Sequence, residues 1–375
     1  MDPVTLTKIY FLNEICRDIW LSGRICDIMN CEVQSLYDIS GLRGQPVVAR
    51  FLKAFELGRK MITENWNSVL TQRQTIFDFL NESFNNLQMK HKDCFPDLRS
   101  GSAILLGSDY SGESSDAPYS IYSFLITTIE EWSKWESTRL KVRKDLFSDS
   151  RRMSFKNLGD SQRKKALIPF LTAANSIEGL SFSVAISKQC ESLFSGEAPL
   201  DLNNPDFQSF KKWKMKVLEK AFITIHFLGF LLAGLAKENQ DVFWFTDEDD
   251  IAANDQRICE LTKLFGWIIS NYLQFNLKHI RCGTTRCDNG TRQIEDLLAI
   301  PDLIAGALSE QLKLKNENGV DGVFFLYRGD FSEKTKTITW WFSYSKTPLK
   351  RLVCFIEQQN DKSKQNVSLF HFYNQ

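Results

Sequence analysis

Three aspartates stand where apolar segments of the chain end or are interrupted. Asp109 and Asp247 each end a short apolar run, and Asp302 lies inside the apolar segment 297–308. A buried carboxylate is costly unless a compensating charge accompanies it. Strands that end at one edge of a sheet face the same crevice. We therefore expect the three side chains to converge around a cation.

A divalent cation would relieve the repulsion among these carboxylates. Mg²⁺ takes oxygen ligands and keeps several waters, so a few aspartates without a complete cage suit it. The predicted ligands are Asp109, Asp247 and Asp302, together with Asp249 from the acidic run 247–250. Two such ions roughly 3.5–4 Å apart activate a water and stabilise the leaving oxygen in phosphodiester cleavage. The pattern therefore predicts Mg²⁺ or Mn²⁺ as cofactor and Asp109, Asp247 and Asp302 as catalytic residues.

Each aspartate also has a simpler structural interpretation. Asp109 could cap a turn, because Asp is common at turns. The acidic run 247–250 could be an exposed helix start, since Asp and Glu favour helix N-termini. A helix could restart at Pro301 and leave Asp302 exposed. The occurrence of all three aspartates, in this order, favours a shared site.

The composition is that of a folded soluble protein. Hydrophobic residues make up 43% of the 375 residues, and Lys+Arg and Asp+Glu both number 46, so nucleic-acid contact would need a local basic patch or a metal. The nine cysteines are scattered and form no CxxC, which favours reduced thiols and a cytoplasmic location. No signal peptide is evident, and the apolar segment 221–236 is short for a membrane span. We therefore expect no membrane partner.

The order of predicted elements indicates an α/β protein in three parts. Residues 1–95 are predicted to form a helical domain, from the helical spacing of apolar residues. A main domain over 101–315 combines strands and helices, which predicts a mixed sheet flanked by helices. The last part, 320–375, contains strand-like runs and predicts a small antiparallel β extension.

Individual elements follow from local patterns. Strands are predicted at 102–109, 117–129, 151–158, 180–188, 241–247 and 276–282, and in the last part at 322–329, 336–345, 349–358 and 366–375. Helices are predicted at 161–177, 207–237, 252–275 and 291–312. Asp160 or Ser161 is placed to cap the first of these helices.

A helix, a glycine turn and a second helix are predicted over 35–62. Gly41 and Gly44 make the turn, and Pro46 begins the second helix. The stretch resembles the helix-hairpin-helix that precedes the RadC-type domain, down to "FELGRKM". The resemblance implies that Arg43 and Gly44 contact a nucleic-acid phosphate through the helix N-terminus. Two packed helices joined by a glycine turn are the alternative.

The main domain, over about 103–312, resembles the bacterial family filed as DUF thirty-eight-hundred. Members open with a strand running into Asp-Glu-Ser-Gly, which stands here as Asp109 to Gly112 with Tyr110 in place of Glu. A later strand ends in Asp, matched by Asp247. The closing helix carries an Ala-Asp-Leu-Ile-Ala-Gly-like motif, matched by "PDLIAGA" at 301–307.

The resemblance implies an RNase H-like fold, a predicted nuclease activity and an association with antiviral defence. It also implies that Lys156, in a Lys-containing stretch between the first two motifs, approaches a substrate phosphate or a metal-bound water. The basic residues Arg151 and Arg152 could track a nucleic-acid backbone, and a solvated basic face is the alternative.

Two hypotheses follow from these patterns. The first is a metal-dependent nuclease that hydrolyses DNA or RNA. The second is a catalytically inactive RNase H-like scaffold that binds nucleic acid or a partner protein, which the replacement of an acid by Tyr110 favours. Binding of Mn²⁺ distinguishes the two.

Overall fold

The computed structural model describes most of the chain from residue 76 onward and little before it. The described residues are 26–27, 65–69, 76–147, 150–190, 205–288, 290–319, 330–344, 346–358 and 365–371. The predicted helix-hairpin-helix at 35–62, with Arg43 and Gly44, lies outside them.

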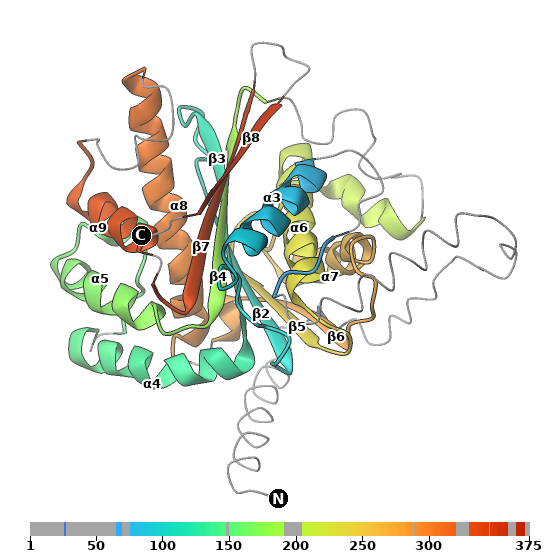
Figure 1. Cartoon of the computed structure of the whole chain (residues 1–375), viewed down its shortest axis with the longest axis horizontal. Helices are drawn as coiled ribbons and strands as arrows, with labels where there is room; N and C mark the ends of the chain where they lie inside the picture. The colour runs from blue at the N-terminus through green and yellow to red at the C-terminus, as the bar shows by residue number, and fades with distance from the viewer. Residues whose placement is uncertain are drawn as a thin grey trace, which may run out of the picture.

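One mixed sheet of eight strands forms the centre of the protein (Figure 1). The strand order is β1-β6-β5-β2-β3-β4-β7-β8. The strands are β1 (Cys26–Asp27), β2 (Ala103–Ser111), β3 (Tyr119–Thr128), β4 (Gly179–Ser187), β5 (Asp241–Thr246), β6 (His279–Thr284), β7 (Leu349–Gln358) and β8 (Gln365–His371).

The direction of the strands changes at β2. On one side β2, β3 and β4 are antiparallel neighbours, and on the other side β2, β5 and β6 are parallel. Three antiparallel strands are thus continued by two parallel ones. The predicted α/β class, a mixed sheet flanked by helices, is confirmed.

Helices cover both faces of this sheet, as Figure 1 shows. One layer contains α3 (Ile76–Lys90), α6 (Met215–Leu235) and α7 (Asp255–Ile269). The other contains α4 (Ile129–Leu146), α5 (Ser161–Ala174), α8 (Gln293–Glu317) and α9 (Glu333–Ser343). Alternate residues of β2 serve the two layers: Ile104 and Leu106 pack with the first, and Ala103 and Leu105 with the second.

Two predicted strands form other structures. The segment 151–158 contains only the 3-10 turn Phe155–Asn157, and α9 replaces the strand predicted at 336–345. In α9, Thr335, Ile338 and Phe342 are buried at helical spacing, so tertiary packing outweighs the β propensity of this Thr-, Ile- and Trp-rich run.

The C-terminal part is not a separate antiparallel unit. β7 pairs in parallel with β4, and only β8 runs antiparallel, to β7. The last strands therefore extend the main sheet. The prediction of a helical N-terminal domain is tested only at α3, which packs onto the main core, and at the strand pair β1–β6.

The apolar helix and the cysteines bear on the environment of the protein. α6 has the length and hydropathy of a membrane span, but 89% of its apolar window is buried inside the protein, so it is a core helix. Cys259, on α7, is disulfide-bonded, which contradicts the prediction that all thiols are reduced. The described free cysteines are Cys94, Cys190, Cys282, Cys287 and Cys354.

Candidate functional site

The parallel pairing of β2 with β5 places Asp109 beside Asp247. Ser108 lies opposite Thr246 in this pairing, and the two aspartates are the next residues along each strand. Neighbouring strands are roughly 4.8 Å apart. The predicted convergence of these two carboxylates at one edge of the sheet thus has a direct cause in the strand register.

α8 brings Asp302 to the same place. Leu298 lies 3.3 Å from the position that a Cβ on Gly107 would occupy, so α8 crosses β2 closely at this glycine. Asp302 is one turn after Leu298 on the same helix face, and Asp109 is two residues after Gly107 on the same face of the strand. α8 continues through Pro301 without a break, so the predicted restart of a helix there is wrong.

Asp109 is the most enclosed of the three carboxylates. It is 8% exposed, and it has no hydrogen bond or ion pair with another described side chain. Burial raises its pKa well above the ordinary value, and the charges of Asp302 and Asp247 raise it further. Among the described residues, the molecule thus keeps an acid with no hydrogen-bond or ion-pair partner next to two others, and the charge of Arg152 offsets only part of the rise in its pKa.

Asp302 is half-buried and held by the chain before α5. Its Oδ2 accepts a 2.7 Å hydrogen bond from the backbone N–H of Phe155. Burial raises the pKa of Asp302 to about 6, although the Phe155 N–H and the Arg152 charge oppose the rise. The Phe155 ring packs at Gly306, where a Cβ would come within 2.2 Å of it, so a glycine is required one turn after Asp302.

Arg152 occupies the position expected for a cation. Its guanidinium forms a bidentate ion pair with Asp247, with N–O distances of 2.7 and 3.2 Å. Its charge also acts on Asp302 and Asp109. The cluster of Asp109, Asp247 and Asp302 is called the acidic centre below, and Arg152 neutralises part of it.

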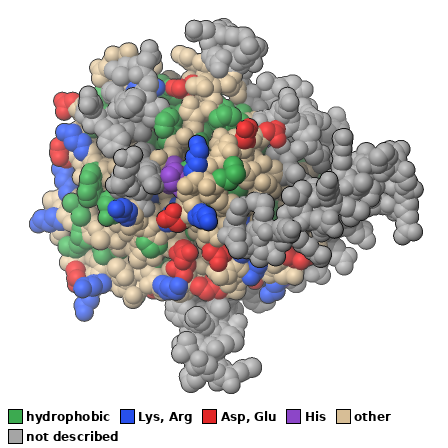
Figure 2. All heavy atoms as spheres, in the orientation of Figure 1, with side chains coloured by type: hydrophobic (Ala, Val, Ile, Leu, Met, Phe, Trp, Pro, Cys, Tyr) green, Lys and Arg blue, Asp and Glu red, His purple; other side chains and the backbone are tan. Residues whose placement is uncertain are grey.

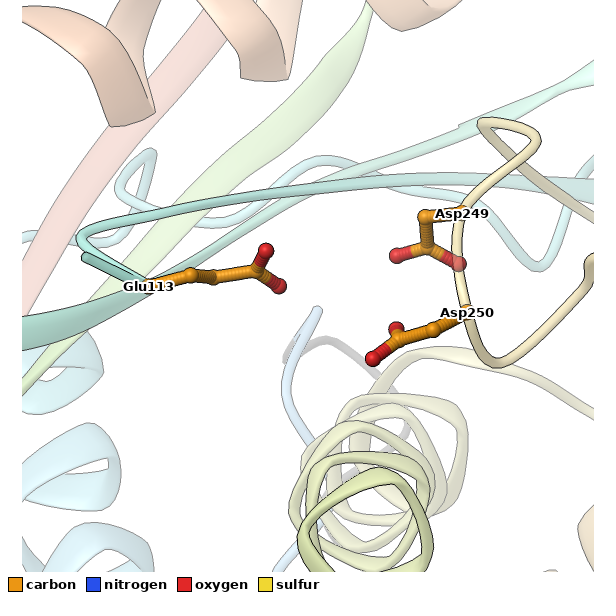
Figure 3. Close-up of side chains that lie close together, drawn as sticks. All are labelled: Glu113, Asp249 and Asp250. Carbon is orange, nitrogen blue, oxygen red and sulfur yellow. The ribbon is translucent and has the colours of Figure 1, made fainter. Parts of the chain in front are cut away.

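A second acidic group lies at the same end of β2 and β5. Figure 3 shows Glu113, Asp249 and Asp250 directed toward one another. Their ligand oxygens lie within 4.8 Å of one another, and among the described residues no other group of three meets this distance. These three residues could hold a metal ion. The acidic centre is therefore less compact than this second group.

The second group already has a cation, the ammonium of Lys220. Lys220 Nζ donates to Glu113, to Asp249 at 2.6 Å and to Asp250 at 3.1 Å, and it lies 4.3 Å from the centre of the Tyr110 ring. Burial opposes the charge of Lys220, but the attraction of Asp249 and Tyr110 together with the hydrogen bonds to Asp249 and Glu113 outweighs it, so the pKa of Lys220 is raised.

Tyr110 belongs to the face of β2 opposite Asp109. It packs against the core that contains α6, and its hydroxyl lies 2.8 Å from Ser108 Oγ. Successive residues of a strand point to opposite faces. The position where the resembled family has Glu therefore faces Lys220, and Glu113 approaches that lysine instead.

Other predicted site residues have different partners, or none among the described residues. Lys156 is exposed, and no hydrogen bond or ion pair of the described residues involves it. Arg151, predicted to track a nucleic-acid backbone, pairs with Asp160 at 2.6 Å. Asp249 belongs to the Lys220 group, and its Oδ1 also accepts from the Ile251 N–H. α7 begins only at Asp255, so the alternative of a helix start at 247–250 is wrong.

Three basic residues lie near the acidic centre or the second acidic group, and the sequence alone does not predict their partners there. Lys334 of α9 lies 3.8 Å from the centre of the Phe155 ring and acts on Asp302, and nothing local to its sequence indicates this. For Lys220 the sequence does contain a signal of acidic partners. The lysine begins a long apolar helical run, and a charge buried there needs partners of opposite charge. For Arg152 the sequence predicts a nucleic-acid contact, whereas the structure pairs it with Asp247.

Comparisons of the chain with protein-family models, with curated proteins and with solved structures find no match. The interpretation of the site therefore depends on its own geometry and charge.

Proposed function

We propose that the chain is a divalent-metal-dependent nuclease that hydrolyses phosphodiester bonds at the acidic centre. The observation that carries this proposal is Asp109, a buried carboxylate with no described partner beside two further aspartates. Support also comes from the strand order, since three antiparallel strands continued by two parallel ones are the arrangement expected of an RNase H-like sheet. The resemblance to the DUF thirty-eight-hundred family supports the same function. A cytoplasmic location is part of the same proposal.

The residues of the acidic centre suit Mg²⁺ or Mn²⁺. All the ligands they offer are carboxylate oxygens, which these ions prefer. Asp109 and Asp302 would hold the ion, and the Asp247 carboxylate would be shared between the ion and Arg152. When bound, the metal would supply a water of lowered pKa and charge stabilisation at the phosphate.

The chain's own groups would prepare this chemistry. The Phe155 N–H fixes the Asp302 carboxylate in one orientation. The Arg152 guanidinium presents a planar pair of donors that fits a phosphate as well as a carboxylate, so it can bind substrate when it leaves Asp247. Lys334 adds a second positive charge beside Asp302.

Asp302→Asn tests the proposal while keeping the hydrogen bond from the Phe155 N–H. The amide oxygen of Asn still accepts the Phe155 N–H, whereas the charge that would hold a metal is lost. We expect cleavage of labelled DNA or RNA in Mn²⁺ to fall at least about 100-fold, because a lost metal ligand costs several kcal/mol of transition-state stabilisation. The exposed Asp116→Asn is the control and should cleave like wild type. Equal cleavage by Asp302→Asn and wild type would exclude this role.

Arg152→Gln is expected to strengthen metal binding. It removes the cation that pairs with Asp247, so calorimetry should give a Kd for Mn²⁺ lower by roughly 10-fold, equivalent to about 1.4 kcal/mol. Arg151→Gln is the matched control, because Arg151 pairs with Asp160. An unchanged Kd in Arg152→Gln would mean that the guanidinium does not compete with the ion.

The Arg152–Asp247 ion pair also supports a second candidate function. If Arg152 is the permanent cation of the acidic centre, the protein is an inactive RNase H-like scaffold that binds nucleic acid or a partner protein. Wild type would then bind no Mn²⁺ at millimolar concentration, and Arg152→Gln would create the binding.

A further inference from the structure

A hollow of about 410 Å³ lies between α5 and α9, away from the residues of the acidic centre. The two helices lie side by side in the outer layer of the protein (Figure 1). Ile168 and Thr172 line it from α5, and Lys336, Trp340 and Tyr344 line it from the α9 side. We call this hollow the α5–α9 groove.

Large hydrophobic side chains are exposed along the groove. Trp340 is 70% exposed, Ile168 61% and Tyr344 42%. Figure 2 shows hydrophobic side chains at the surface on the left of the molecule, where α5 and α9 lie in Figure 1, with Lys and Arg side chains nearby. A clustered apolar surface of this kind indicates a binding site.

The two exposed rings form a platform. The centres of Trp340 and Tyr344 are 6.2 Å apart, and their planes differ by 20°. Trp341, beneath them, is fixed because its indole N–H donates to Asn175 Oδ1 at 2.7 Å and the Arg351 guanidinium lies over its ring at 4.2 Å. Two nearly parallel rings on a fixed base present flat faces on which other planar groups can stack.

The charges around the groove favour an anionic ligand. None of the nine residues that line it is acidic, and Lys336 is one of them, with its Nζ 3.1 Å from the exposed carboxylate of Glu333 on the same helix. Lys164 and Lys165 are exposed on α5 and lie one turn before Ile168. Aromatic platforms beside lysines are the means by which proteins hold unpaired bases and their phosphates.

α9 connects the groove to the acidic centre. Lys334 in its first turn acts on Asp302, and Trp340 follows six residues later. At 1.5 Å per residue, the two positions are about 9 Å apart along the helix. Two to three stacked nucleotides, at about 3.4 Å each, cover this distance.

We propose that the α5–α9 groove binds single-stranded nucleic acid, with unpaired bases stacked on Trp340 and Tyr344 and the backbone near Lys336. The proposal deepens the proposed function by naming the substrate as single-stranded, and in that respect it rests on it. Binding at the groove needs no metal, so it is measurable apart from cleavage.

The test is fluorescence anisotropy of labelled single-stranded DNA and RNA oligonucleotides with the full chain in EDTA. Loss of one stacked base is worth roughly a 10-fold change in Kd. We therefore expect Trp340→Ala to weaken binding at least about 10-fold and Trp340→Phe to restore most of it. Trp267→Ala is the matched control, because Trp267 is an exposed tryptophan, at 45%, on α7 in the opposite layer.

The outcomes separate this proposal from its alternatives. Equal binding by wild type and a folded Trp340→Ala variant would overturn it. So would a change from dimer to monomer in Trp340→Ala with oligonucleotide affinity unaltered, because the groove would then join two copies of the chain. Oligonucleotide binding that depends on Trp340, without metal-dependent cleavage, would support the groove proposal and contradict the nuclease proposal. Metal-dependent cleavage that is unchanged in Trp340→Ala would support the nuclease proposal and contradict the groove proposal.

Discussion

Asp109→Asn is expected to abolish metal-dependent cleavage and, at the same time, to stabilise the metal-free protein. Asn lacks the charge that would bind the metal, so cleavage should fall at least about 100-fold. In EDTA the same change removes a buried charge that Asp302 and Asp247 repel. We expect the free energy of unfolding to rise by about 1 kcal/mol or more, measured by denaturant titration at neutral pH.

The pH dependence has a definite sign. An acid whose pKa is raised in the folded state contributes stability below its ordinary pKa and loses it as pH rises through the folded value. For Asp302 this range runs from 3.8 to about 6, and Asp109 shifts in the same direction. Wild type in EDTA should therefore lose stability as pH rises above 3.8, and Asp109→Asn should lose less, because it lacks the contribution of Asp109.

Divalent metal should reverse this loss in wild type but not in Asp109→Asn. Protons compete with the ion for the same oxygens, so Mn²⁺ should raise the melting temperature at about pH 7.5 and have little effect at about pH 5. Asp116→Asn, at an exposed acid, serves as the control. A destabilised Asp109→Asn that retains full cleavage would contradict both parts of the expectation.

Lys220→Met is expected to lower the free energy of unfolding by about 3 kcal/mol. Lys220 is 9% exposed, and its removal leaves Asp249 without its ion-pair partner. Breaking a buried ion pair costs roughly 3–5 kcal/mol, and the lower end applies because the Asp249 side chain keeps 23% of its exposure. Denaturant titration of both proteins measures the difference.

The same variant distinguishes an ammonium from a metal ion in the second acidic group. Without Lys220, the oxygens of Glu113, Asp249 and Asp250 remain close enough to share a divalent cation. Millimolar Ca²⁺ or Mn²⁺ should therefore stabilise Lys220→Met more than wild type. The surface substitution Lys313→Met, at an exposed ion pair with Asp116, should have no measurable effect. Equal metal stabilisation of Lys220→Met and wild type would show that Lys220 is not the cation of this group.

Much of the sheet was predictable because local patterns determine it. β2, β4 and β5 are short apolar runs bounded by polar residues, and such runs form strands wherever both faces are covered. Asp160 caps α5 as predicted, accepting from the N–H groups of Gln162 and Arg163. The predictions failed where packing decides, as in α9, whose β-favouring residues bury one helical face.

The sequence by itself determined that Asp247 follows a strand, that Asp109 lies near the end of another, and that Asp302 lies in an apolar helix, although β2 continues two residues past Asp109 to Ser111. Strand ends at one edge of a sheet face the same crevice, so the pattern predicted that the carboxylates converge, and the parallel pairing of β2 with β5 decided that Asp109 and Asp247 are neighbours. Only the tertiary structure decided which cations accompany the carboxylates. Arg152 and Lys220 lie 95 and 29 residues from Asp247 and Asp249, and no local spacing relates such positions. Ion pairing depends on atoms a few ångströms apart in space, and the fold alone sets those distances.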